Sequence, residues 1–284
     1  MKAVLVTSAI LSVAITFGII AALIEPVVHF FGEVSFSEFF AVHDADRADR
    51  LKPAVIPLVT GTLVVTVVAL MVAIPIGLGA AMYLSEYASK RARKYLKPTV
   101  ELLAGVPSVV YGFFAVIFVT PNLLQGFLGL PVGFTNALSA GLVLGVMIIP
   151  TVASLSEDAM SAVPQALRQG SLAMGANRMQ TTLKVVFPAA LSGIAAAIVL
   201  GLSRAVGETM IVTLAAGSQK NFSLNPMEGM QTMTGFIATT AGGENPVGSL
   251  EYNMLFAVAL LLFLITLVIN AISIALVRRF RQVY

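Results

Sequence analysis

The sequence predicts an all-α, multi-pass membrane protein with six transmembrane helices, and three observations support this. Of the 284 residues, 58% are hydrophobic and only 11% are charged, whereas a soluble domain carries about 25% charged residues. Six apolar runs reach the roughly 20 residues that a helix needs to cross a bilayer. No run alternates with the period of 2 that is typical of a membrane β-barrel. A single transmembrane domain over residues 1–284 is therefore expected, and a soluble enzyme is disfavoured.

The apolar runs are expected to be helices because a backbone in hydrocarbon must satisfy its own hydrogen bonds. The first run could instead be a signal peptide, but it exceeds the usual apolar region of roughly 7–15 residues, and Glu25-Pro26 is a poor cleavage context. We therefore expect an uncleaved first helix. The predicted spans are residues 3–24, 58–84, 102–124, 134–155, 189–216 and 254–277.

The fourth span contains Gly141 and Gly145. This GxxxG spacing lets another helix approach closely. We expect the partner to be a helix of the same subunit rather than of a second copy.

The charges between the spans set the expected orientation, because Lys and Arg near the ends of a span are retained in the cytoplasm. Twelve of the 17 Lys and Arg residues fall on one side, at positions 2, 90–97, 168–184 and 278–281. Four fall on the other side, at 47–52 and 220, and the segment 25–53 on that side is acidic. Both termini are therefore expected in the cytoplasm.

The fifth span alone contains charged residues, Arg204 and Glu208. Their spacing of four places them on one face of a helix, where they can reach each other. Leu, Ile and Val favour insertion by roughly 0.3–0.6 kcal/mol each, whereas a central Arg opposes it by roughly 2.5–3.5 kcal/mol and an acid by a similar amount. The pair is therefore expected to face other helices or water rather than lipid.

Two roles are open for this pair. It could neutralise itself and pin two helices together, or it could belong to an anion pathway. A guanidinium fork matches the oxygens of phosphate or of a carboxylate, and an adjacent acid would let a bound anion leave. Counted from Pro188, Arg204 would lie about 24 Å along the helix axis, toward the outer half of the membrane.

The cytoplasmic segment 156–188 is too long and too patterned for a turn. Residues 164–188 (PQALRQGSLAMGANRMQTTLKVVFP) predict a short helix, a break at Gly175 and a second helix that ends before Pro188. The spacing resembles the EAA loop of ABC importer permeases, E-A-A, three residues, G, nine residues, I-x-L-P. Gln169 stands in place of the family's acid, Gly170 and Ser171 stand in place of its alanines, and Gly175 and Pro188 are in register.

Other segments are similar to the permeases of the phosphate-specific transport (Pst) family. Residues 201–210 (GLSRAVGETM) and 105–112 (GVPSVVYG) resemble segments of these permeases. Residues 154–158, 251–256 and 278–284 look more like the PstC branch than the sister PstA branch. The resemblance covers most of the chain and implies the type I permease fold of ABC importers.

The resemblance also implies a function and partners. It implies a permease subunit that moves inorganic phosphate across the inner membrane of a bacterium. The implied partners are a PstA-like sister permease, two PstB-like ATP-binding subunits and an external PstS-like phosphate-binding protein. Arg204 and Glu208 match the family's charged pair associated with phosphate passage, and Gln169 to Gly175 match the loop that docks on the ATP-binding subunit.

Missing motifs narrow the possibilities further. The sequence has no G-x-x-x-x-G-K-[ST] motif, so ATP hydrolysis is expected on another chain and this chain is not expected to be an enzyme. It has no cysteine and no H-E-x-x-H, and its two histidines, His29 and His43, fall in the acidic segment, so neither a metal nor another cofactor is expected.

Two other functions stay open. The nearer one is a permease for another oxyanion, such as molybdate or sulfate. The further one is a secondary anion carrier or channel, for which the sequence lacks a clear pair of matching interrupted helices. A purely structural membrane protein is disfavoured because it gives no reason for charged residues in hydrocarbon.

Overall fold

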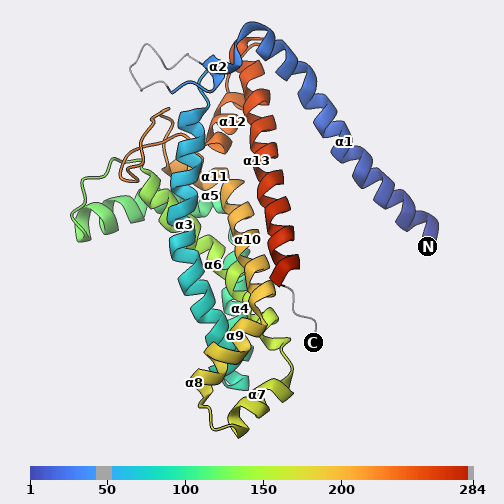
Figure 1. Ribbon diagram of the computed structural model, residues 1–284. Helices are drawn as coiled ribbons and strands as arrows, with labels where there is room; N and C mark the ends of the chain where they lie inside the picture. The colour runs from blue at the N-terminus through green and yellow to red at the C-terminus, as the bar shows by residue number, and fades with distance from the viewer. Residues whose placement is uncertain (43–52, 281–284) are drawn as a thin grey trace.

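The computed structural model describes residues 1–42 and 53–280, and within these ranges it contains helices and no strand (Figure 1). Five helices are long and apolar enough to cross a membrane. A bent pair, Arg178–Ala189 and Leu191–Val206, whose axes differ by 71°, brings the number to six if the pair counts as one span. The chain is thus an all-α, multi-pass membrane protein, as predicted.

The helices follow one another along the chain with few long connections. The first half forms α1 (Lys2–Glu33), α2 (Phe36–Phe39), α3 (Ile56–Met82), α4 (Lys90–Ala104), α5 (Ser108–Phe114) and α6 (Ala137–Ser161), with π-helical segments η1 (Tyr83–Tyr87) and η2 (Ala115–Phe127). The second half forms α7 (Gln165–Ala173), α8 (Arg178–Thr181), η3 (Thr182–Val186), α9 (Phe187–Ala189), α10 (Leu191–Val206), α11 (Met210–Ala215), α12 (Met233–Ala241) and α13 (Leu250–Phe280).

The elongated bundle has two distinct ends (Figure 1). Helices α7 and α8 lie at one end, and we call it the α7 end. Helices α2 and α12 and the beginning of α13 lie at the other, and we call it the α12 end. Helices α3, α6 and α10 run between the two ends.

Helix α1 is longer than the predicted first span. It continues to Glu33, so Glu25, His29 and Glu33 are helical rather than part of an acidic loop. Toward the amino terminus α1 leans away from the other helices, and its side chains there are exposed (Figure 1). Near its carboxyl end Phe30 is fully buried, against Phe39 and residues of α13. Helix α1 is therefore joined to the bundle at the α12 end.

Other boundaries also differ from the predicted ones. Helix α6 extends to Ser161 rather than ending at 155, which shortens the cytoplasmic segment predicted at 156–188, and α13 begins at Leu250 rather than at 254. Residues 43–52 of the acidic segment, which include His43, lie outside the described residues.

The predicted third span, 102–124, is divided near its start. Helix α4 ends at Ala104, α5 begins at Ser108, and the helix then continues as η2 to Phe127. Pro107 lies in the gap, and a proline disfavours the helical conformation of the residue before it. Residues 102–104, which hydropathy assigns to the span, therefore end the basic helix α4 instead.

Glycines bring α6 directly against α3. A Cβ atom placed on Gly141 would lie 2.6 Å from the Cβ of Val68, and one placed on Gly145 would lie 2.7 Å from the carbonyl oxygen of Ala69. Side chains do not approach this closely, so glycine is needed at both positions. The expectation that this GxxxG pair packs within the subunit is confirmed.

Replacing Gly145 by alanine is expected to destabilise the folded chain by about 1–3 kcal/mol, because the new methyl group must push a backbone carbonyl away. Gly79 of α3 is the matched control, because a Cβ there meets nothing within 4 Å. Gly79→Ala is expected to stabilise by about 0.4–1 kcal/mol through the unfolded state. Thermal unfolding of the purified protein in detergent measures both, and equal midpoints for the two variants would contradict the packing account.

Candidate functional site

The predicted fifth span, 189–216, is not one continuous helix. Helix α10 ends at Val206, Gly207 caps it, and the separate helix α11 begins at Met210. The break follows from Gly207, which is a poor helix former, and from Glu208, whose side chain competes for backbone amides. The apolar run therefore contains an interruption of the kind that transporters place at their solute sites.

Glu208 satisfies the backbone groups that this break leaves open. Its Oε1 atom accepts hydrogen bonds from the amides of Met210 (3.0 Å) and Ile211 (3.3 Å). Its own carbonyl oxygen accepts a hydrogen bond of 2.6 Å from the hydroxyl of Thr234, on α12. Irregular backbone at membrane depth persists only where such partners exist.

Arg204 lies in the last turn of α10, and its side chain is exposed at the surface of this chain. Its Nη1 donates a hydrogen bond of 3.3 Å to Oγ1 of Thr151 on α6. Nearby, the hydroxyl of Tyr111 on α5 donates to the carbonyl of Leu103 at 2.9 Å. Counted from Leu191, where α10 begins after the bend, Arg204 lies about 20 Å along the axis.

The expectation that Arg204 and Glu208 share a helical face is wrong. The helix ends between them, and among the ion pairs within residues 1–42 and 53–280 none joins these two side chains. Glu208 instead acts as a cap for α11. The guanidinium therefore keeps donors available at the surface, which is the arrangement that binding of an anion needs.

Glu208→Ala is expected to expose the amides of Met210 and Ile211, because no acceptor replaces the carboxylate. Loss of a helix cap costs about 1 kcal/mol, or roughly fivefold in the local opening equilibrium. Hydrogen exchange at these two amides measures the change. Glu208→Gln, which keeps one acceptor oxygen, is the control and is expected to exchange more slowly than Glu208→Ala. Wild-type exchange in Glu208→Ala would contradict the capping role.

The predicted coupling segment forms a compact hairpin at the α7 end. Gln169 and Gly170 are exposed on α7, while the Ser171 hydroxyl lies 2.9 Å from that of Thr181 on α8. The predicted break is present at Gly175, whose φ of +86° is a left-handed conformation that favours glycine. The first half of the hairpin thus exposes Gln169 and Gly170, and the turn that follows depends on the left-handed conformation of Gly175.

A capping box starts the second half of this hairpin. The side chain of Asn177 accepts from the amide of Gln180, and the side chain of Gln180 accepts from the amide of Asn177. The prediction that this helix ends before Pro188 is wrong. The chain stays helical through Pro188, which sits in the first turn of α9, and bends by 71° only beyond Ala189.

Ion pairs at the α7 end connect the helices, and the sequence analysis missed them. Glu157 of α6, with a fully buried side chain, pairs with Arg93 and Lys97 of α4, and the Lys97–Glu157 distance is 2.6 Å. Lys97 also lies 2.8 Å from Asp158, and hydrogen bonds to Asp158 and Glu157 raise the pKa of Lys97. The spacing of Arg93 and Lys97 placed them on one face of a helix, but nothing local to them predicted acids more than 50 residues away.

A second pair at this end is buried. Arg168 of α7 and Glu86 of η1 are each only 9% exposed, and Arg168 Nη2 lies 2.9 Å from Glu86 Oε1. Losing one partner of a buried ion pair costs about 3–5 kcal/mol, since the other charge is left uncompensated. Because breaking this ion pair is costly, it holds the coupling segment firmly to η1, at the end of α3.

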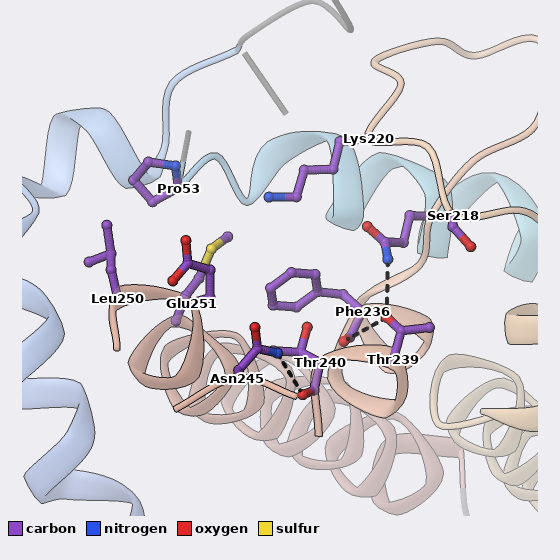
Figure 2. A pocket seen from close by; sticks show the side chains of 11 residues that line it. Pro53, Ser218, Lys220, Phe236, Thr239, Thr240, Asn245, Leu250 and Glu251 are labelled. Carbon is purple, nitrogen blue, oxygen red and sulfur yellow. Dashed lines mark hydrogen bonds between the residues drawn. The ribbon is translucent and has the colours of Figure 1, made fainter. Parts of the chain in front are cut away.

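At the α12 end a polar cavity of about 290 Å³ is present (Figure 2). The ammonium of Lys220 lies 5.1 Å from the centre of the Phe236 ring, and Glu251 extends into the same space. Burial lowers the pKa of Lys220, and the charge of Glu251 acts in the opposite direction. The sequence analysis counted Lys220 only as a charge outside the membrane, because one lysine in a loop carries no pattern that predicts burial.

Within the described residues no group of three or more His, Asp or Glu side chains could hold a metal ion. The candidate site thus has three parts. They are the guanidinium of Arg204 at the broken helix, the ion-paired hairpin at the α7 end and the polar cavity at the α12 end.

Comparison with known proteins identifies the relatives of this chain. A family model described as "binding-protein-dependent transport system inner membrane component" matches residues 73–282. The chain is 38% identical over 227 residues to a probable ABC transporter permease, YqgH of Bacillus subtilis, covering 78% of this chain and 72% of that protein. It is 35% identical over 246 residues to the phosphate transport system permease protein PstC of Pasteurella multocida, covering 81% and 76%.

Solved structures agree on the fold. A chain of a bacterial alginate ABC transporter superposes with a TM-score of 0.67 at 17% identity, covering 97% of this chain and 94% of that one. A chain of the methionine ABC transporter MetNI, in an inward-facing conformation, superposes with a TM-score of 0.59 at 24% identity, covering 78% and 94%. The predicted permease fold and the predicted relation to PstC are confirmed. The chain belongs to the family of binding-protein-dependent transport system inner membrane components.

Proposed function

We propose that this chain is the PstC-like permease subunit of an ATP-driven importer of inorganic phosphate. The observation that carries the proposal is Arg204, exposed at a broken membrane helix in a chain 35% identical to a phosphate permease. An isolated anion in hydrocarbon has a very large solvation penalty, so a pathway for phosphate needs a fixed cation at membrane depth. A guanidinium supplies that charge together with a fork of donors that matches phosphate oxygens.

The exposure of Arg204 also supports a second permease. A charged side chain that faces lipid is disfavoured, by up to roughly 2.5–3.5 kcal/mol at the centre of a span on insertion scales. The face of α10 that carries Arg204 is therefore expected to meet protein and water. In the proposed assembly a PstA-like sister permease covers this face, and the phosphate route runs between the two subunits.

The two ends of the bundle are assigned different partners. The hairpin around Gly175 at the α7 end docks on an ATP-binding subunit in the cytoplasm, with Gln169, Gly170 and Ser171 in its exposed first half and Pro188 at its far end. Two such subunits supply ATP hydrolysis, because this chain has no phosphate-binding loop of its own. The α12 end receives phosphate from an external binding protein. Both termini then lie in the cytoplasm of a bacterial inner membrane.

The proposal is tested by purification of the affinity-tagged chain from mildly solubilised membranes, followed by reconstitution in proteoliposomes. A second permease and an ATP-binding subunit are expected to co-purify, and labelled phosphate is expected to accumulate only with ATP and the binding protein. Unlabelled phosphate should compete at least tenfold better than sulfate or molybdate. Uptake by the purified chain alone, or preferred competition by another oxyanion, would contradict the proposal.

A further inference from the structure

One buried guanidinium ties together three elements at the α7 end. Arg168 belongs to α7, and its Nε lies 3.2 and 3.4 Å from the two carboxylate oxygens of Glu86 on η1. Its Nη2 donates to Glu86 at 2.9 Å and to the carbonyl of Met160, in the last turn of α6, at 2.8 Å. Its Nη1 donates to the carbonyl of Val163, just beyond α6. A single side chain thus joins the coupling segment to the ends of α3 and α6.

Only arginine has the geometry for this junction. Its planar fork presents five donors in fixed directions, whereas the ammonium of lysine is a point charge with three. Here three nitrogen atoms are used at once, toward a carboxylate on one side and two carbonyls on the other. The carbonyl of Met160 also accepts from the amide of Val163 at 3.1 Å, so the guanidinium adds a second donor to the turn that ends α6.

Next to this junction, one side of α7 borders a cavity rather than closely packed side chains. A cavity of about 330 Å³ lies there, lined by residues of η1, α7 and α8 that include Ser85, Gln165 and Leu172. The polar contact of α7 with the bundle at this place is the guanidinium with its carboxylate and carbonyl partners. On its apolar side, Leu167 of α7 packs against a small cluster that includes Ala81 and Met160. A shift of α7 is therefore transmitted to the bundle through Arg168 together with this one apolar contact.

The helices that Arg168 holds also carry the proposed phosphate site. Helices α3 and α6 are in close contact at Gly141 and Gly145. Further along α6, Thr151 accepts the hydrogen bond of Arg204. A continuous set of contacts thus runs from the coupling segment through Arg168 and α6 to Arg204.

We propose that Arg168 is a positioning residue for transport: it locks the coupling helix to α3 and α6, so that motion driven by the ATP-binding subunit reaches the helix that carries the anion site. This inference rests on the proposed function. Arg168 touches no substrate, so its removal is expected to separate ATP hydrolysis from uptake rather than to abolish phosphate binding.

The test uses the assembled complex in proteoliposomes and the variant Arg168→Met. Phosphate uptake per ATP hydrolysed is expected to fall at least tenfold, while hydrolysis per assembled complex stays within about twofold of wild type. The matched control is Asp158→Asn, which removes an ion pair at the same end that does not reach α7. The control is expected to keep the wild-type ratio.

A structural readout is independent of phosphate. The chain has no cysteine, so spin labels can be placed at Tyr83→Cys and Ala173→Cys, both exposed, to report the distance from η1 to α7. One narrow distance distribution is expected in the wild-type background and a broad one with Arg168→Met. If Arg168→Met fails to assemble, the double variant Glu86→Gln/Arg168→Met, which leaves no unpaired buried charge, takes its place.

The outcomes separate the two hypotheses. A broadened distance together with loss of coupling supports the positioning role. An unchanged uptake ratio with an unchanged distance overturns it. Failure of both variants to assemble, while Asp158→Asn assembles, also overturns it, because the pair would then serve folding alone. A wild-type complex that moves no phosphate overturns the proposed function, yet a distance that broadens only with Arg168→Met would still support the positioning role.

Discussion

Replacing Arg204 by alanine is expected to lower ATP-driven phosphate uptake at least about 100-fold. A hydrogen bond to a charged group contributes about 1.5–3 kcal/mol, and two such bonds from one guanidinium correspond to a factor of about 100 or more. The loss should appear in uptake and not in assembly, because the hydrogen bond of Arg204 to Thr151 in the described part of the chain is long, at 3.3 Å. Uptake of labelled phosphate, normalised to the assembled complex, measures it.

Two control variants separate the charge of Arg204 from its geometry. Arg204→Lys keeps a cation but loses the fork, and an intermediate loss of roughly tenfold is expected. Thr151→Val removes the contact of Arg204 with α6 while the guanidinium stays, and a smaller effect is expected. Unchanged uptake by a normally assembled Arg204→Ala complex would count decisively against the proposed role.

Replacing Gly175 by valine is expected to uncouple ATP hydrolysis from uptake or to prevent assembly. Gly175 has a φ of +86°, and a left-handed conformation costs a residue with a side chain roughly 1–2 kcal/mol. No atom lies within 4 Å of a Cβ placed there, so the cost comes from the backbone and not from crowding. The turn must change its path, and α8 then no longer lies correctly beside α7.

Gly170 provides the matched control for this prediction. A Cβ there also meets nothing within 4 Å, but its φ is an ordinary one. Gly170→Ala also restores the alanine that is usual in the EAA loop. It is expected to assemble and to transport like the wild type, while Gly175→Val loses at least tenfold in uptake per ATP hydrolysed. Normal coupled transport by Gly175→Val would refute this role of the turn.

The sequence predicts the class of this fold well because hydropathy identifies the apolar segments that a bilayer accepts as spanning helices. Five of the six apolar runs correspond to long helices, and the remaining run, 189–216, covers the second helix of the bent pair and α11. Hydropathy does not report where a helix ends inside such a run. The run 189–216 remains apolar on both sides of Gly207, so the break there is invisible to a count of apolar residues. Conversely, Glu25 ends the first apolar run although the helix continues through it to Glu33.

The candidate site is only partly predictable for a related reason. Arg204 and Glu208 could be identified because no other predicted span contains charged residues. The expectation that they share one face, however, depended on a continuous helix. The glycine in the coupling segment was predictable because the motif and the backbone both need it. The pair of Arg168 with Glu86 joins residues 82 positions apart, and a contact between distant segments leaves no local pattern.

The measurement that tests the central claim most directly places a removable cation at position 204. Because the chain has no cysteine, Arg204→Cys in a complex with cysteine-free partners carries the only thiol. The variant is expected to lose uptake, and 2-aminoethyl methanethiosulfonate, which attaches an ammonium group, is expected to raise it again at least tenfold. A neutral reagent of the same size should not. Equal uptake after the cationic and the neutral reagent would show that no cation is needed there and would contradict the account.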